Sequence, residues 1–127
     1  MSTNIFFPAD RLEALTTVLK EYGKQNDMFG EDCTLSDMLY QFGVETYTNR
    51  GTGDLVVDRL GDYADLHLVT RKAIAVLTDF VQSTDDDLPF MEFVDDDARP
   101  FVKLVLQPGG TWSIYEPVLT WKAAGSL

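Results

Sequence analysis

Cysteine, histidine and long apolar segments are scarce in this chain of 127 residues, and each scarcity argues against a class of structure or function. The single cysteine, Cys33, excludes an internal disulfide framework and agrees with a reducing compartment. The single histidine, His67, obliges any histidine-dependent catalytic triad to use that one position. Apolar runs are short, because no segment reaches the roughly 18 uninterrupted apolar residues of a membrane span.

The amino terminus lacks the features of a secretory signal. The segment "MSTNIFFPAD" has no basic start and no apolar run of sufficient length. We therefore expect a cytoplasmic protein with no membrane partner. The chain is 45% hydrophobic and 12% aromatic, which is the composition of a folded globular protein. Its length predicts a single compact acidic domain over residues 1–127.

Basic residues are also few. Lys and Arg number 10 against 21 Asp and Glu, so the formal net charge is -11. Direct binding of nucleic acid or of an anionic membrane is therefore disfavoured, because phosphate binding relies on clustered Lys and Arg. The negative charge is concentrated in two blocks. Residues 26–65 hold nine acids and two bases, and residues 85–98 hold seven acids and no base.

Helical patterns occupy much of the first two thirds of the chain. A helix is predicted from Pro8 with Gly23 as its stop, and a second begins at Thr34, where "TLSD" matches a capping box. A third, central helix is predicted from Asp62 to Ser83. Residues 44–60 fit either a hairpin that turns at 51–53 or a loop that leads into the third helix. The inward stripes of the first two helices are Leu12, Leu15, Leu19 and Tyr22, and Leu35, Met38, Leu39 and Phe42.

After Ser83 the hydrophobic pattern changes to a period of two, which is typical of strands. Strands are predicted at 101–107, 111–115 and 118–121, with 88–94 as a fourth candidate. We therefore expect an α+β fold in which about three helices in the N-terminal two thirds pack on a small antiparallel sheet formed by the C-terminal third.

No residue pattern points to catalysis, to a cofactor or to a metal. His67 lies near the apolar stripe of its predicted helix, which favours a structural role. Cys33 follows two acidic residues, whose negative charges disfavour a thiolate nucleophile. The stretch "GTGD" at 51–54 lacks the ending of a phosphate-binding loop and is typical of a turn. We expect a protein that is not an enzyme and that needs no cofactor.

The segment "DDDLPFMEFVDDD" at 85–97 has two Asp triads around an apolar stretch. As a strand, the eight steps between the triads would span about 26 Å, so one metal ion cannot bridge them. Two interpretations stay open: solvated ends of a strand, or an acidic surface that a basic protein recognises. In the second case, carboxylates on a rigid frame take positions that phosphates would otherwise occupy.

The leading hypothesis is a small acidic protein that inhibits or neutralises a basic partner, in particular a partner that handles nucleic acid. An immunity protein for a toxin or a phage anti-defence protein would act in this way, including by nucleic-acid mimicry. The alternative is a structural or assembly subunit that forms homo-oligomers through sheet edges and aromatic residues. Under the first hypothesis the chain is a monomer or a small homo-oligomer. The predicted partner-binding residues are Asp85, Asp86, Asp87, Glu92, Asp95, Asp96 and Asp97, with Asp54, Asp58, Asp62 and Asp65 as a second patch.

Overall fold

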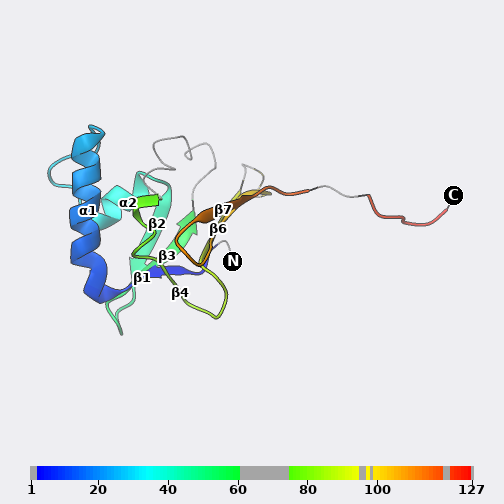
Figure 1. The fold of residues 1–127 in the computed structure, drawn as a ribbon, viewed down its shortest axis with the longest axis horizontal. Coiled ribbons are helices and arrows are strands. Elements are labelled where there is room, and N and C mark those ends of the chain that lie inside the picture. The colour runs from blue at the N-terminus through cyan, green and yellow to red at the C-terminus, as the bar shows by residue number, and fades with distance from the viewer. Residues whose placement is uncertain (1–2, 61–74, 95–96, 98, 119–120, 127) are drawn as a thin grey trace.

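The computed structural model describes residues 3–60, 75–94, 97, 99–118 and 121–126. This described part contains two α-helices, a short 3-10 helix and two antiparallel sheets of four and three strands. The α+β fold class is therefore confirmed. The helices lie on one side of the sheets, and the C-terminal segment runs away on the other side (Figure 1). No helix in the described ranges is long and apolar enough to cross a membrane.

Helix α1 (Leu12–Gln25) follows the 3-10 turn η1 (Ala9–Arg11) and buries one stripe of side chains. The prediction that Gly23 ends this helix is wrong. The helix continues to Gln25, and Gly23 instead allows the Phe29 ring to approach the helix, because a Cβ at this position would clash with that ring. The chain that leaves the helix thus folds back closely over it. The predicted inward residues Leu15, Leu19 and Tyr22 are buried.

Helix α2 (Leu35–Tyr40) begins with the predicted capping box. The Asp37 amide donates to Thr34 Oγ1 over 3.2 Å, and the Thr34 amide donates to Asp37 Oδ2 over 3.1 Å. These two bonds satisfy backbone donors that a helix start otherwise leaves unpaired. Gly43 then adopts a φ of 78°, which suits glycine and turns the chain from the helix into a strand. The buried residues after the cap are Met38, Leu39 and Phe42.

The first sheet has the strand order β2-β3-β1-β4. The hairpin interpretation of residues 44–60 is confirmed, with the glycines of 51–53 in its turn. The prediction of a single sheet from the C-terminal third is wrong, because three of these strands come from the first half of the chain. Its strands β1 and β4 are too short to show a period of two. The strand bounds are Ile5–Phe7 for β1, Val44–Thr48 for β2, Leu55–Leu60 for β3 and Gln82–Ser83 for β4.

The predicted helix from Asp62 to Ser83 lies mostly outside the described residues, as does His67. Its end is wrong, because Gln82–Ser83 form β4 and pair antiparallel with Ile5 and Phe6 of β1. Pairing with a strand about 80 positions earlier in the sequence overrides the local helical pattern here. Residues 75–76, within the predicted range, are helical, and residues 77–80 form a turn. The described residues otherwise hold two α-helices, where about three were predicted.

The second sheet has the order β5-β6-β7, and its three strands agree with the predictions for 88–94, 101–107 and 111–115. Of the predicted strand at 118–121, the described residues Val118 and Trp121 lie outside any strand, and residues 119–120 lie outside the described ranges. Pro117 supplies the reason, because it has no amide hydrogen to continue a ladder. The strand bounds are Phe90–Val94 for β5, Pro100–Leu106 for β6 and Trp112–Tyr115 for β7.

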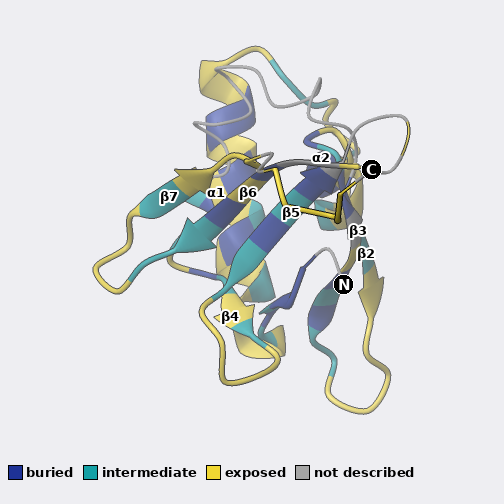
Figure 2. Ribbon diagram, turned by 90° about the vertical axis from the view of Figure 1, so that its right-hand side faces the viewer, coloured by how far each residue is buried: buried dark blue, intermediate teal, exposed yellow. Residues whose placement is uncertain are grey.

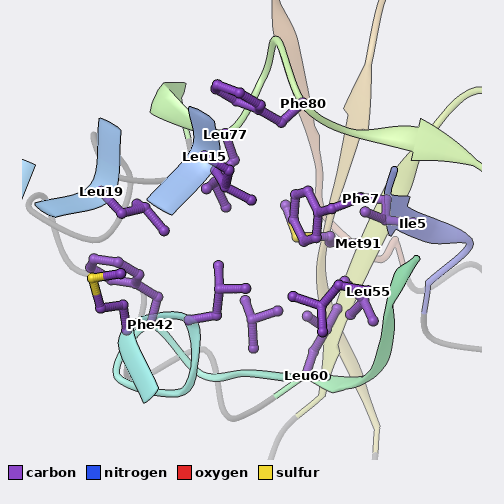
Figure 3. Close-up of a cluster of buried hydrophobic side chains, with 14 of the residues drawn as sticks. Ile5, Phe7, Leu15, Leu19, Phe42, Leu55, Leu60, Leu77, Phe80 and Met91 are labelled. Atoms are coloured by element: carbon purple, nitrogen blue, oxygen red, sulfur yellow. The ribbon is translucent and has the colours of Figure 1, made fainter. Parts of the chain in front are cut away.

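Both sheets and both helices contribute to one hydrophobic cluster (Figure 3). An isolated antiparallel bridge between Thr3 and Met91 links the start of β1 to β5. The buried apolar side chains of the strands point toward this cluster. Figure 2 presents the opposite face of the strands, with α1 behind them. Central members of the cluster are Ile5, Phe7, Leu15, Leu55, Met91 and Phe93.

Candidate functional site

The outer face of the first sheet carries a row of four side chains, one from each strand. Backbone register pairs Tyr47 with Val56, Val56 with Phe6, and Phe6 with Gln82. Residues paired across strands point to the same face, and the sequence neighbours of Val56 point into the core. Tyr47 is 52% exposed, and Val56 and Phe6 are half-buried. The row thus forms a partly apolar surface on the side away from the helices.

A hollow of about 500 Å³ lies beside this row. Its lining brings together Tyr47 of β2, Val56 and Asp58 of β3, and Thr84, which directly follows β4. Asp58 belongs to the first acidic block, and Thr84 precedes the first Asp triad. The two acidic blocks therefore approach each other at this hollow. Residues of β1 and the segment before it complete the lining: Thr3, Asn4 and Ile5.

The loop that carries the first Asp triad is anchored by Asn4, whose side chain is 2% exposed. Asn4 Nδ2 donates to Ser83 Oγ over 3.0 Å, to Asp85 Oδ1 over 2.9 Å and to the Leu88 carbonyl over 3.1 Å. Asn4 Oδ1 accepts from the Phe90 amide over 2.9 Å. Both ends of this buried amide are hydrogen-bonded, so the loop between β4 and β5 has a fixed shape.

Asp85 is the member of the triad that holds this loop together. The Asn4 amide and the Ser83 hydroxyl hold the pKa of the Asp85 carboxyl below its ordinary value, because both donate to the ionised form. Its Oδ1 also accepts from the Asp87 amide over 3.0 Å. The Asp85 carboxylate is thus hydrogen-bonded within the anchored loop, although Asp85 itself is exposed at the surface.

Three other carboxylates, one at the hollow and two on the anchored loop, have no such hydrogen bonds. Asp58, Asp86 and Asp87 are exposed, and their side chains make no hydrogen bond or ion pair with any residue that the structure describes. Asp58 projects from a strand, and the other two stand on the anchored loop. Their negative charges are thus presented to solvent on a fixed frame, and such charges attract basic groups.

The other predicted partner-binding residues lie elsewhere. Asp54 accepts a 2.8 Å hydrogen bond from the Ala9 amide at the start of η1, so it stabilises a helix start. Glu92 is half-buried on β5 opposite Lys103 and lines a separate hollow of about 210 Å³. Asp97 is exposed in the connection between β5 and β6. Four of the predicted residues lie outside the described ranges: Asp62, Asp65, Asp95 and Asp96.

The described residues offer little to a metal or to a nucleophilic mechanism. They contain no cluster of three or more His, Cys, Asp or Glu that could hold a metal ion. Cys33 is half-buried, and its Sγ lies 3.8 Å from Gln41 Nε2, which donates to it. Residues 51–54 form part of the β2–β3 turn, as predicted, where the Gly51 amide donates to Asn49 Oδ1 over 2.9 Å.

Sequence reasoning missed three residues of this site: Asn4, Ser83 and Tyr47. Asn4 and Ser83 are 79 positions apart, and neither belongs to a motif. A polar residue in the apolar context "NIFF" was the only available signal for Asn4. Tyr47 lies in a strand whose register became defined only through its pairing with β3.

No protein-family model, no curated protein and no solved structure matches this chain. Its function is therefore inferred from the geometry of the hollow and from the acidic groups beside it.

Proposed function

We propose that this chain is a small, non-enzymatic acidic protein that binds and neutralises a basic protein. The observation that carries the proposal is that one hollow on the first sheet is lined both by Asp58 of the first acidic block and by Thr84, which directly precedes the anchored loop of the second block. The binding surface is defined by Asp58, Asp86 and Asp87, and we call it the acidic face.

The physical advantage of this arrangement is that the carboxylates of the loop are held in fixed positions. The Asn4 network fixes the loop before any partner arrives, so little conformational entropy is lost when the carboxylates are engaged. Fixed negative charges also steer a basic partner and raise its association rate. A partner that binds nucleic acid would offer lysines and arginines spaced for phosphates. An immunity protein or an anti-defence protein that imitates a nucleic acid would act in this way.

The test compares two triple variants with equal changes of charge. In the first, Asp58, Asp86 and Asp87 are replaced by Asn; in the second, Glu13, Glu31 and Asp32 on the helical side are replaced by Gln or Asn. Immobilised protein is used to capture basic proteins from a lysate of the source cells. The acidic-face variant is expected to lose capture, and the helical-side variant to retain it.

The dependence of capture on salt concentration provides a second measurement in the same test. Capture by the unmodified chain is expected to weaken steeply between about 50 and 500 mM salt, because the Debye length shrinks from more than 10 Å to a few ångströms. Equal capture by both triple variants, or capture that is insensitive to salt, would contradict the proposed function.

A second candidate function is that of an assembly subunit, favoured by the open edge of the second sheet. Within the described residues, strand β7 pairs with β6 on one side only, so its other side presents unpaired backbone groups. Ile114 and Tyr115 on this strand are 53% and 52% exposed. Light scattering of the isolated chain tests this candidate: a stable oligomer that persists at high salt supports it, and a monomer at all concentrations contradicts it.

A further inference from the structure

The C-terminal segment after β7 is the most exposed apolar part of the described chain. Val118 is 82% exposed and Trp121 is 94% exposed. The segment leaves the body of the protein instead of packing on it (Figure 1). Pro117 stops the ladder of β7 and directs the chain outward. We call residues 116–126 the arm. An indole exposed to this degree is unusual, because Trp is among the residues that gain most from burial.

The hollow on the first sheet has the size and chemistry to accept such a side chain. Its volume of about 500 Å³ lies within the range of roughly 300–1,000 Å³ that is typical of binding clefts. The Tyr47 ring and the Val56 side chain provide apolar contact, and the exposed side chains of Thr84 and Asp58 provide polar contact. An aromatic anchor with one polar edge matches this mixture.

Charge complementarity points to the same pairing. Lys122 directly follows Trp121 and has the only charged side chain after Glu116. It belongs to a chain whose formal net charge is -11. Asp58 lines the hollow, and its carboxylate has no partner among the described residues. A Trp placed in the hollow would bring the neighbouring Lys within reach of this carboxylate.

We propose that Trp121 of one copy of this chain occupies the hollow of a second copy, with Lys122 facing Asp58. Within a single copy the arm points away from the body, so a second copy is the partner that it can reach. If the exchange is mutual, each copy donates one arm and accepts one, which closes a symmetric dimer and leaves no unpaired arm. This contact shares Asp58 with the acidic face but does not use Asp86 or Asp87, and it gives the assembly candidate a defined interface.

The first test is the oligomeric state measured by size-exclusion chromatography with light scattering across a range of concentrations. The unmodified chain is expected to form a dimer, and Trp121→Ala to raise the dissociation constant at least about tenfold, as expected for a buried aromatic anchor. The matched control is Tyr40→Ala, which removes an aromatic that is 64% exposed on the helical side and should leave the dimer unchanged. A monomeric unmodified chain, or a Trp121→Ala variant with an unchanged dimer, would overturn the inference.

A charge exchange tests the specific pair. Asp58→Lys and Lys122→Asp should each weaken the dimer, and the double variant should restore it, because the attraction is re-established with opposite signs. Failure of the double variant to recover any affinity would refute the Lys122–Asp58 contact. A buried indole in a monomer, detected by a blue-shifted fluorescence that Lys122→Asp abolishes, would show that the arm folds onto its own chain and would overturn the exchange.

The capture assay separates this inference from the proposed function. Asp86 and Asp87 do not line the hollow, so a Trp121→Ala monomer should still capture the basic protein. Loss of the dimer with capture intact supports the arm contact as a separate property of the chain. An unchanged dimer with lost capture would instead overturn the arm contact, because Trp121 would then belong to the partner-binding surface.

Discussion

Asn4 and Asp85 are joined by a 2.9 Å hydrogen bond that connects the start of the chain to its first Asp triad. The bond spans 81 positions in the sequence and ties β1 to the loop between β4 and β5. It explains how a loop with three adjacent acidic residues keeps a fixed shape. One carboxylate is held by donors, and the other two are left to face solvent.

Asn4→Ala should lower the free energy of unfolding by about 2 kcal/mol or more. The substitution removes four hydrogen bonds and leaves partly buried groups such as the Phe90 amide without this partner. Urea unfolding of the two proteins measures the difference. Asp86→Asn serves as the control and should change stability by less than about 0.5 kcal/mol, because its side chain is exposed and unpaired within the described residues. If Asn4→Ala lowered the free energy of unfolding by no more than the control does, the role of Asn4 in anchoring the loop would be contradicted.

The stability of the chain should fall in acid in a way that depends on Asp85. Its pKa in the folded state is lowered by the Asn4 and Ser83 donors, so the ionised form favours folding. This contribution is complete above the unfolded pKa of about 3.9 and is lost as the pH falls through the lower folded value. The difference in unfolding free energy between the unmodified chain and Asp85→Asn should therefore decrease from neutral pH to about pH 3. A difference that stays constant over this range would show that the carboxylate does not favour the folded state.

Gly23→Ala should destabilise the fold by about 1–3 kcal/mol, despite the higher helix propensity of alanine. The added methyl group would lie 2.4 Å from Phe29 Cδ2 and 3.0 Å from the Met28 carbonyl oxygen. Relief would require Phe29 to leave its edge contact with the Phe42 ring, whose centroid is 5.5 Å away. Gly30→Ala is the matched control, because a methyl group added there would meet no described atom within 4 Å. Thermal unfolding measures both, and equal melting temperatures for the two variants would contradict the close approach.

Thr46→Val should raise the free energy of unfolding by about 1 kcal/mol. The Thr46 hydroxyl is buried and has no hydrogen-bond partner among the described residues, so its desolvation is uncompensated. Valine keeps the branched shape next to Val57, its neighbour on β3. Thr48→Val on the same strand is the control, because Thr48 is exposed and its hydroxyl remains hydrated. Chemical denaturation of both variants measures the effect, and a destabilised Thr46→Val variant would indicate that the hydroxyl has a partner.

The sequence predicted those parts of the fold whose signals are local. The capping box at Thr34, the hairpin around 51–53 and the strands of the second sheet depend on residues close in sequence, and all three are confirmed. The first sheet was missed because β1 and β4 are short and pair only with distant strands. Local patterns carry no information about such pairings.

In the candidate site, too, the sequence revealed the local features but not the long-range contacts. The density of acidic residues at 85–87 was visible in the sequence, and so was the separate block that contains Asp58. The placement of Asp58 and of Thr84, which precedes the triad, at one hollow was not visible, because it depends on the pairing of β1 with both β3 and β4. Nor could the sequence distinguish Asp85, which holds the loop, from Asp86, which faces solvent.

The position of the bound partner on the surface is the most direct test of the acidic face. Backbone amide chemical shifts of the isotope-labelled chain are recorded by NMR with and without the captured basic protein. We predict that the shifts change at Asp58, Asp86 and Asp87 and stay constant along the exposed side of α1. Changes confined to α1, with the acidic loop unaffected, would contradict the account.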